Sequence, residues 1–326
     1  MFGSGTGPRR PSDWGSLHRL LKAPAGDSGV TDPRFSVIIT TFNRPAALAH
    51  SLAALARSDY PPSNFEVVVV DDGGSEPLDA IIAGFGEALS VRLIRQVNSG
   101  PAKGRNRGVE AARNEFLAFT DDDCEPQPGW LAALARRLQR SPQSLIGGRT
   151  VNGLKENPYS AASQCIIEMV YAYYNTDPEH SQFFATNNLA VRADLFRDCG
   201  GFDETFRISE DREFCNRWQH RGLTLAYEPE AVVAHRHPLT FGDFWRQHFG
   251  YGRGAARFHH TCAARRSGQL RDHFGFYAAL PHSWRVATRG LERSQLARIV
   301  PLLGLWQVAN AAGFGYELLL SQVGKI

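Results

Sequence analysis

In the stretch Phe116-Leu-Ala-Phe-Thr-Asp-Asp-Asp-Cys-Glu-Pro126, a short apolar run is followed directly by the carboxylates of Asp121, Asp122 and Asp123. An apolar run bounded by polar residues is typical of a buried strand. Carboxylates at the end of such a strand repel one another unless a cation neutralises them. Carboxylate oxygens, water and a substrate diphosphate together suit Mg²⁺ or Mn²⁺, so the stretch predicts a divalent metal site. The alternative is a solvated turn that caps a helix beginning near Trp130.

Apolar runs that end in polar residues recur upstream of this stretch. The runs that begin at Phe35 and Phe65 are almost wholly apolar, as in strands buried on both faces of a parallel sheet. The second run ends in Asp71 and Asp72. A further strand is expected at residues 91–97, and helices are expected at residues 46–57, 77–89 and 103–112. The strand ends should therefore meet at one edge of a sheet, where open α/β sheets bind their ligands.

Downstream of Trp130 the pattern predicts further helices and strands. Helices are expected at residues 130–140, in a segment that ends at Asp198, and in a segment that begins at Glu210. Strands are expected at residues 145–151, 224–227 and 232–237. Residues 156–180 are aromatic and fit either a helix or a covering loop. Ser209 is expected to cap the helix that follows it. Glu210 and Asp211 then lie in the first turn, where the helix dipole favours negative charge.

The composition is that of a soluble globular protein. Of the 326 residues, 43% are apolar and 21% are charged, which excludes a fibrous or wholly disordered chain. The five cysteines have irregular spacings without a Cys-x-x-Cys pair, so neither a zinc site nor a disulfide framework is expected, and a reducing cytoplasm fits. Residues 1–33 lack the apolar segment of a secretory signal and are expected to form a flexible arm.

Positive charge is concentrated in the C-terminal part. Residues 236–300 contain eleven arginines but only three acidic residues, a net charge of about +8, whereas residues 1–235 carry about −5. A basic, aromatic-rich segment of this kind favours an anionic partner, namely a membrane surface, a lipid phosphate or the diphosphate of a donor. Nucleic acid is not expected, because no nucleic-acid-binding module accompanies the charge.

Several motifs occur in the order found in the family 2 glycosyltransferases, which this chain resembles over roughly residues 35–240. They are Ser36-Val-Ile-Ile-Thr-Thr-Phe-Asn-Arg44, Val69-Val-Asp-Asp-Gly-Gly-Ser75, Asn98-Ser-Gly-Pro-Ala-Lys-Gly-Arg-Asn-Arg-Gly108, Phe119-Thr-Asp-Asp-Asp123, Phe184-Ala-Thr-Asn-Asn-Leu-Ala-Val-Arg192, Gly200-Gly-Phe-Asp203 and Ser209-Glu-Asp-Arg-Glu-Phe-Cys-Asn-Arg217. Those enzymes are inverting and have the GT-A fold. The resemblance implies an α/β protein with a Rossmann-like mixed sheet flanked by helices. It places the catalytic domain at residues 34–238 and leaves residues 239–326 as a basic, aromatic-rich helical extension.

The resemblance also assigns residues to the donor. It implies that Thr40 and Phe42 flank the nucleotide base, and that Asp72 accepts a hydrogen bond from the base N3–H. Asp121 and Asp123 are implied to bind the metal and the ribose, with Asp122 as the third candidate. The full set of implied donor contacts is Thr40, Phe42, Arg44, Asp72, Lys103, Arg105, Asn106, Asp121, Asp122, Asn188 and Arg246. A diphosphate leaving group gains charge as the glycosidic bond breaks, and a divalent cation with Lys or Arg stabilises that charge.

The Glu-Asp pair at residues 210 and 211 resembles the catalytic motif of the family. The resemblance implies that Asp211 is the general base that deprotonates the acceptor hydroxyl, with Glu210 as its neighbour. Otherwise the pair only satisfies a helix N-terminus. His235 stands where some members supply a third metal ligand beside Asp121 and Asp123, although a lone histidine is more often a core residue. His237 is expected to face the same side of its strand.

The C-terminal part resembles one bacterial, non-processive branch of the family. Candidates for closing over the diphosphate are Trp245, Arg246, Gln247 and His248. The Gln-x-x-Arg-Trp motif and the transmembrane helices of the processive synthases are absent. Residues 299–320 are apolar but interrupted by polar residues, which predicts an amphipathic segment in an oligomer interface or on a membrane. An ordinary packed helix is the alternative.

The sequence therefore predicts a metal-dependent inverting glycosyltransferase that uses Mn²⁺ or Mg²⁺. The donor is a nucleotide-diphosphate sugar, expected to be a UDP-sugar, and the acceptor is a glycan or a lipid-linked molecule in glycan, glycolipid or cell-envelope biosynthesis. The expected location is the cytoplasm or the inner face of the membrane, and a homo-oligomer is a candidate state. One alternative is a sugar nucleotidyltransferase, which favours a Gly-rich loop that residues 41–45 lack. The other is a non-catalytic sugar-nucleotide or membrane-surface binding module, which would have lost its carboxylates.

Overall fold

The structure is a computed structural model that describes residues 32–268 and 272–322, and it is built around one eight-stranded mixed sheet. The strands are β1 (Phe35–Thr41), β2 (Phe65–Asp71), β3 (Val91–Arg95), β4 (Phe116–Phe119), β5 (Cys124–Pro126), β6 (Leu145–Asn152), β7 (Leu189–Arg192) and β8 (Leu225–His235). Their order in the sheet is β3-β2-β1-β4-β7-β6-β8-β5. Strands β1 to β4 are parallel, whereas β7 is antiparallel to both β4 and β6. Of the expected N-terminal arm, residues 1–31 lie outside the described residues.

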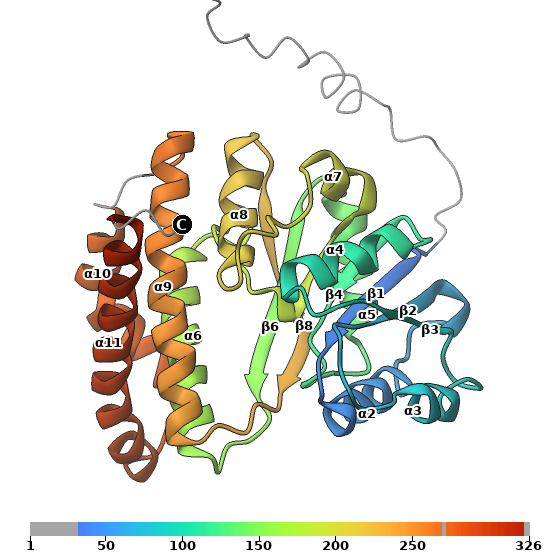
Figure 1. The fold of residues 1–326 in the computed structure, drawn as a ribbon, viewed down its shortest axis with the longest axis horizontal. Coiled ribbons are helices and arrows are strands. Elements are labelled where there is room, and N and C mark those ends of the chain that lie inside the picture. Colours follow the sequence, from blue (N-terminus) through green and yellow to red (C-terminus); the bar gives the residue numbers. More distant parts are fainter. Residues whose placement is uncertain (1–31, 269–271, 323–326) are drawn as a thin grey trace, which may run out of the picture. The chain divides into compact units, whose positions relative to one another are not determined.

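The apolar runs form the predicted strands, and helices cover both faces of the sheet (Figure 1). One face packs against α2 (Pro45–Leu55), α3 (Asp79–Gly84) and α5 (Trp130–Arg140), and the other against α4 (Pro101–Ala111), α7 (Ala193–Asp198) and α8 (Glu210–His220). Val37 and Ile39 of β1 point into the first of these cores, and Ile38 points into the second. All seven residues of β2 are buried. Burial on both faces explains why these strands are apolar throughout.

The topology brings the predicted polar strand ends together. Strand β1 lies between β2 and β4 and is parallel to both, so residues 42–44, 71–72 and 121–123 gather at one edge of the sheet. The antiparallel pairing of β5 with β8 then sets Cys124 opposite His235. As a result, Asp123 lies beside His235, although more than a hundred residues of chain separate them.

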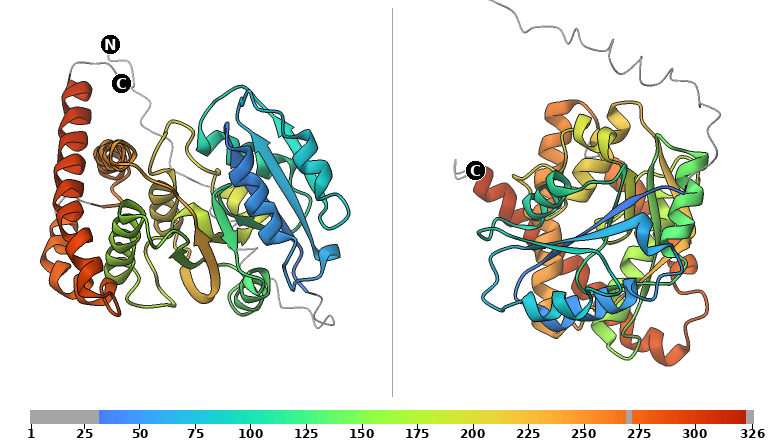
Figure 2. Two further views of the ribbon diagram at one scale, coloured as in Figure 1. Left: turned by 90° about the horizontal axis from the view of Figure 1, so that it is seen from below. Right: turned by 90° about the vertical axis from the view of Figure 1, so that its right-hand side faces the viewer.

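A layer of long helices stands beside the sheet (Figures 1 and 2). It consists of α6 (Pro158–Tyr174), α9 (Phe241–Arg265), α10 (Asp272–Ala287) and α11 (Arg293–Gln322). The ambiguous stretch at residues 156–180 is thus mostly helical, and the side chain of Asn157 caps the helix. The helices share a third apolar core that includes Met169, Phe244 and Trp306. The division into two domains at residue 238 stays a prediction.

Helix α11 is longer and less amphipathic than the sequence predicts. It includes the whole apolar stretch 299–320 and accommodates Pro301 in its interior. Trp306 and Ala309 are buried against neighbouring helices, but Val308 is 60% exposed, so apolar residues occupy both sides. None of the described helices is long and apolar enough to cross a membrane.

Glycines bring α9 and α11 into close contact. A Cβ atom at Gly252 would overlap the carbonyl oxygen of Asn310, and a Cβ atom at Gly313 would overlap that of Phe249. The obstructing atoms belong to the backbone, so a side-chain rotation relieves neither overlap. Only glycine lets the two helices approach this closely.

Replacing Gly313 by alanine is expected to destabilise the protein, because the new methyl group must push α11 away from α9. Overpacking of this kind costs about 1–3 kcal/mol, which outweighs the roughly 0.5–1 kcal/mol that alanine gains over glycine in a helix. Gly304→Ala is the matched control, since an added Cβ at Gly304 meets no heavy atom within 4 Å. The control should be slightly stabilised. Urea unfolding compares the two variants, and equal midpoints would contradict the close contact.

Candidate active site

The three carboxylates that follow β4 differ in exposure and in partners. Asp122 is completely buried, whereas the side chain of Asp121 is 27% exposed. Arg44, from the loop after β1, bridges the other two: its Nη2 lies 2.6 Å from Asp122 Oδ1 and its Nη1 lies 2.8 Å from Asp123 Oδ2. Burial raises the pKa of Asp122 to about 7, although Arg44 acts in the opposite direction. The guanidinium of Arg44 therefore offsets part of the negative charge at the end of β4.

Asp123 and His235 form the part of this cluster that suits a metal ion. Asp123 Oδ1 and His235 Nε2 are 3.3 Å apart, and Cys124 Sγ belongs to the same group of close donor atoms. Burial opposes the ionisation of Asp123, but the His235 ring holds its pKa below the ordinary value. An ionised carboxylate and an imidazole fit Mn²⁺. The Cys124 thiol suits Mn²⁺ less well, because soft sulfur ligands select Cu(I) or Zn²⁺ whereas carboxylates suit Mn²⁺.

Asp121 takes part in a different contact, with Arg105. The Nη2 of Arg105 donates to Asp121 Oδ1 at 2.8 Å, and its Nη1 donates to Glu210 Oε1 at 2.5 Å. Arg105 is only 6% exposed. Burial lowers the pKa of this guanidinium, but the two carboxylates raise it by more, so Arg105 is charged. Asp121 lies outside the group of donor atoms around Asp123, and its role as a metal ligand stays a prediction.

Asp211 lies in the first turn of α8, two residues after a residue with unusual backbone geometry. Ser209 has a φ of 69°, in the left-handed region that non-glycine residues rarely adopt. Ser209 is the N-cap residue, as predicted, but its side chain makes no capping hydrogen bond. Burial and the charge of Glu210 raise the pKa of Asp211 to about 7. A carboxylate with that pKa is suited to take up a proton near neutral pH.

Helix α9 supports the segment that leads into Asp211. A Cβ atom at Gly250 would meet the side chain of Ile208 at 2.6 Å, and one at Gly254 would overlap Ser209 Oγ. The two glycines are one turn apart on the same face of α9, so no side chain at these positions separates the helix backbone from residues 208–209. The close packing helps to hold Ser209 in its left-handed conformation.

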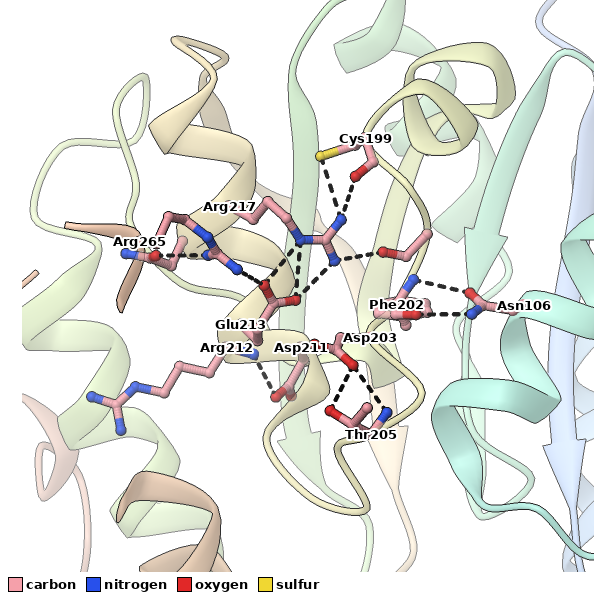
Figure 3. A network of polar contacts seen from close by, with 12 residues as sticks. Asn106, Cys199, Phe202, Asp203, Thr205, Asp211, Arg212, Glu213, Arg217 and Arg265 are labelled. Carbon is pink, nitrogen blue, oxygen red and sulfur yellow. Dashed lines mark hydrogen bonds and ion pairs between the residues drawn. The ribbon is translucent and has the colours of Figure 1, made fainter. Parts of the chain in front are cut away.

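Two arginines join α8 to the elements around it (Figure 3). Arg217 and Arg265 both pair with Glu213, which is completely buried. Arg217 also donates to the carbonyl oxygens of Cys199 and Gly201. Neither Glu213 nor Arg265 was predicted from the sequence. The i,i+4 spacing of Glu213 and Arg217 signals their pair, but no local pattern signals Arg265, which lies 52 residues away.

The amide of Asn106 fixes the Gly-Gly-Phe-Asp turn. Its Oδ1 accepts from the backbone N–H of Phe202 and its Nδ2 donates to the carbonyl oxygen of Phe202, each at 2.9 Å (Figure 3). The Nδ2 also donates to Glu204 at 3.1 Å. The amide is thus engaged within the protein, and the donor contact expected of Asn106 stays a prediction.

Asp72 organises the loop that precedes α4. Its buried carboxylate accepts hydrogen bonds from Gln96 Nε2 at 2.7 Å and from the backbone N–H groups of Ser99 and Gly100 at 2.8 and 2.9 Å. Gly100 has a φ of 94° and directly precedes the helix. The carboxylate therefore shapes the loop that leads into α4, and its contact with a nucleotide base stays a prediction.

The other residues predicted to bind the nucleotide surround this loop. Phe42 is 46% exposed, and Lys103 is exposed in the first turn of α4. Thr40 is half-buried beside Gly104 of the same helix. The aromatic ring and the ammonium group are accessible to a ligand.

Asn188 and Arg246 each have partners within the protein. Asn188 is completely buried; its Oδ1 accepts from Trp130 at 2.8 Å, and its Nδ2 donates to the carbonyl oxygens of Arg149 and Ala231. Its side chain has no surface open to a ligand, so the geometry assigns it a structural role. Arg246 is 73% exposed and pairs with Asp243 at 2.5 Å on the surface of α9.

A cavity of about 1210 Å³ reaches from some of the predicted donor and metal residues to the predicted base, although Thr40, Phe42, Asp72 and Lys103 do not line it. Arg105, Asp121 and His235 line one part of it, and Glu210 and Asp211 lie along its wall. It continues between α6, α9, α10 and α11, where the lining from α9 includes Gln247, His248 and Tyr251 but not Arg246. The cavity is larger than the roughly 300–1,000 Å³ of ordinary small-molecule sites, so it has room for two ligands.

The sequence matches known protein families over most of its described length. The model of glycosyl transferase family 2 matches residues 36–200, and that of glycosyl transferase family group 2 matches residues 121–314. A pre-mycofactocin glycosyltransferase of Mycobacterium tuberculosis is 30% identical over 245 residues, which cover 74% of this chain and 50% of that protein. A hyaluronan synthase of Pasteurella multocida is 39% identical over 240 residues, which cover 62% of this chain and 24% of that protein. The chain thus spans half or less of the length of these relatives.

Solved structures share the fold. A mannosyltransferase from Pyrobaculum calidifontis, in complex with GDP-Man and Mn²⁺, superimposes with a TM-score of 0.61 at 17% identity, covering 95% of this chain and 92% of that one. Residues 1–349 of TarS from S. aureus, in complex with UDP-GlcNAc, give a TM-score of 0.53 at 18% identity, covering 90% and 92%. With the mixed sheet described above, this likeness confirms the predicted GT-A fold.

Replacing Arg105 by glutamine is expected to lower the free energy of unfolding by about 3–5 kcal/mol, because Glu210 then remains buried without a counter-charge. Arg107→Gln is the matched control. Arg107 lies in the same helix and pairs with Glu110, but both side chains are more than half exposed, so its loss should cost about 0.5 kcal/mol or less. Chemical unfolding of both variants measures the difference. A small and equal loss in both would show that the Arg105 contacts are not a structural requirement.

Proposed function

Because the chain belongs to glycosyl transferase family 2, we propose that it transfers a sugar from a nucleotide-diphosphate sugar to an acceptor hydroxyl, with inversion at the anomeric carbon. One observation carries the proposal: a single cavity is lined both by Asp211, whose pKa is about 7, and by Arg105, Asp121 and His235. Asp211 is suited to take a proton from an alcohol. Arg105 and a metal ion are suited to stabilise a departing diphosphate.

The proposed reaction is a single displacement. Asp211 takes the proton of the acceptor hydroxyl while the oxygen attacks the anomeric carbon. The bond between that carbon and the diphosphate breaks, and the diphosphate leaves with the bonding electron pair. We propose that Arg105 and Lys103 stabilise the negative charge that develops on the leaving group. A Mn²⁺ or Mg²⁺ ion would be held by Asp123 and His235, with Asp121 as a further candidate, and would supply Lewis-acid stabilisation of the diphosphate.

The surroundings of Asp211 support its role as the base. Burial contributes most to raising its pKa, Glu210 and Asp121 add to the effect, and Arg105 opposes it. Tyr171 of α6, Tyr251 of α9 and Cys215 of α8 are further titratable groups that interact with it. Burial raises the pKa of both hydroxyl groups, so both stay neutral at physiological pH.

We propose UDP as the nucleotide. Asp72 holds three donors of the loop before α4, and a carboxylate offers about four lone-pair sites. One site therefore remains for the N3–H of a uracil base, which Thr40 and Phe42 would flank. The two neighbouring structures contain GDP-Man and UDP-GlcNAc, so GDP is the competing nucleotide.

Two other functions have less support. A sugar nucleotidyltransferase favours a Gly-rich phosphate loop after the first strand, and residues 41–45 are Thr-Phe-Asn-Arg-Pro. A non-catalytic binding module has no use for a base or for metal-binding carboxylates, yet Asp123, His235 and Asp211 are all in place.

Release of nucleotide diphosphate from a panel of UDP- and GDP-sugars, with Mn²⁺, with Mg²⁺ and with a chelator, tests the proposed function. One donor should be hydrolysed slowly even without an acceptor, and the chelator should abolish this. In the wild type, sugar transfer should fall about tenfold for each pH unit below 7, because a base with a pKa near 7 is protonated there. Asp211→Asn should lose roughly 10²–10⁴-fold in transfer while it still binds the donor.

Asp79→Asn serves as the control, because Asp79 is an exposed carboxylate whose partner is Arg95. Its activity should match that of the wild type. Transfer by Asp211→Asn at the wild-type rate would exclude Asp211 as the base. A panel in which no donor is bound or hydrolysed with metal present would exclude the transferase.

We propose that the acceptor belongs to glycan, glycolipid or cell-envelope biosynthesis and that the protein works at the cytoplasmic face of a membrane. Support comes from the basic edge, which we define as Arg285, Arg289, Arg293 and Arg298 at the end of α10 and the start of α11. All four are exposed, and among the described residues none forms an ion pair. Val286 and Val300 beside them are 48% and 50% exposed. Basic and apolar side chains together suit an anionic lipid surface.

The double variant Arg285→Gln, Arg289→Gln should bind vesicles containing anionic lipid about thirtyfold more weakly than the wild type, at roughly 1 kcal/mol per arginine. Arg107→Gln, Arg136→Gln is the charge-matched control, because these two exposed arginines lie outside the C-terminal helices. Co-sedimentation at low and high salt measures the affinity. Equal weakening in both double variants would assign binding to net charge, and concentration-dependent self-association without vesicle binding would make the surface an oligomer interface.

A further inference from the structure

The part of the cavity between the long helices differs in chemistry from the part near β4. We call it the helical compartment and define it by Ile167, Val170 and Tyr173 of α6, Phe276 of α10, and Trp306 and Phe314 of α11. The charged lining residues are Arg105, Asp121, Arg207, Glu210, Asp211 and Arg212, all of them outside the four long helices, and the guanidinium of Arg212 lies over the ring of Phe258 of α9. Among the described residues, no lining residue from α6, α9, α10 or α11 is Asp, Glu, Lys or Arg. The cavity therefore has its charged lining on the side of α4, the residues after β4 and the start of α8, whereas the long helices contribute apolar, aromatic and uncharged polar side chains and His248 and His259.

The polar side chains of the long helices that line the cavity include Ser163 and Gln164 of α6, Gln247 and His248 of α9, and Asn310 of α11. His248 is 1% exposed and packs against the rings of Phe244 and Tyr251 at 4.3 and 5.6 Å. Burial lowers its pKa to about 4, so the ring carries no charge at neutral pH. Its Nε2 lies 3.4 Å from Ser163 Oγ, while its Nδ1 has no hydrogen-bond partner among the described residues. Away from Arg212, which borders it at Phe258, this wall can accept a hydroxyl group or a ring but contains no Lys or Arg to pair with a phosphate or a carboxylate.

We infer that the helical compartment binds an uncharged apolar group, alkyl or aryl, that belongs to the acceptor. The acceptor is then amphipathic: its hydroxyl reaches Asp211, and its apolar portion lies among the aromatic side chains of α6, α10 and α11. This inference rests on the proposed function, because it names the substrate class of the same site. The cavity's volume of about 1210 Å³ leaves room for such a group beside a donor sugar. Burial of apolar surface supplies the binding energy, and the donor site is not needed for it.

Gly315 allows the compartment to be narrowed without disturbing the fold. It lines the cavity on α11, and a Cβ atom added there meets no heavy atom within 4 Å. Gly315→Phe should therefore place a ring at the rim of the compartment. Gly304→Phe is the matched control: Gly304 lies on the same helix, has equally open space around an added Cβ, and does not line the cavity. Ala311→Phe, at another lining position of the same helix, replaces Gly315→Phe if that variant fails to fold.

Isothermal titration calorimetry of the full chain with octyl glucoside, below its micelle-forming concentration, and with methyl glucoside tests the inference. The wild type and Gly304→Phe should bind the octyl compound at least about tenfold more tightly, which is the gain from burying two methylene groups. The heat-capacity change of binding should be negative, as apolar burial requires. Gly315→Phe should lose this preference while its affinity for UDP stays unchanged.

Equal affinity for the two glucosides in the wild type, or an undiminished preference in Gly315→Phe, overturns the inference. The titrations need no donor turnover, so their outcome is separate from that of the proposed function. If donors are hydrolysed but the octyl compound has no advantage, the acceptor inference alone fails. If the octyl compound binds but no donor is bound or hydrolysed, the compartment is an apolar ligand site in a protein that is not a transferase, and the assignment to an acceptor is overturned.

Discussion

The buried guanidinium of Arg105, in α4, donates hydrogen bonds both to Asp121, just after β4, and to Glu210, at the start of α8. These two elements are separated by some ninety residues of chain and belong to different halves of the site. A buried guanidinium with two carboxylate partners tolerates little displacement, because any shift leaves a charge without its counter-charge in a medium of low dielectric constant. The relative position of Asp211 and the carboxylates of β4 therefore depends on this one side chain. The hydrogen bonds of Asn106 to Phe202 and the ion pairs of Glu213 with Arg217 and Arg265 reinforce the same arrangement.

The environments of the carboxylates shift their pKa values in different directions. Asp123 stays ionised because His235 and Arg44 are beside it, which is the state a metal ligand requires. Burial and the charge of Glu210 raise the pKa of Asp211 to about 7, so this carboxyl is near the midpoint of its titration at neutral pH. A pair of acidic groups whose pKa values are pushed in opposite directions is the usual sign of a division of labour between binding and proton transfer. Here the difference between the two pKa values comes from burial and from neighbouring side chains, some of which belong to distant elements.

Much of the fold could be predicted from local patterns, because buried parallel strands must be apolar and their polar ends must meet at one edge. The strands beginning at Phe35, Phe65 and Phe116 follow this rule. The contacts within the site could not be predicted to the same degree. Arg44 was expected to touch the donor but also bridges Asp122 and Asp123, and Asn188 occupies the interior. Such contacts depend on which strands are neighbours in the sheet, and the hydrophobic pattern of a sequence does not reveal strand order. The left-handed Ser209 was missed for a related reason: its preference as a cap is local, but α9 packs directly against it.

The glycines of α9 have a consequence for how the protein can be recombined with its relatives. Gly250 and Gly254 lie against Ile208 and Ser209, and Arg265 at the far end of the helix pairs with Glu213. Sterically and electrostatically, α9 belongs with the segment that carries Asp211. A chimera that exchanges C-terminal segments to change the acceptor should therefore be joined after Arg265. A junction at residue 238 would bring in a foreign helix whose side chains, at the positions of these two glycines, would collide with the residues that precede Asp211. An exchanged α10–α11 segment must also keep the glycine at position 313, because α11 packs directly against the backbone of α9 there.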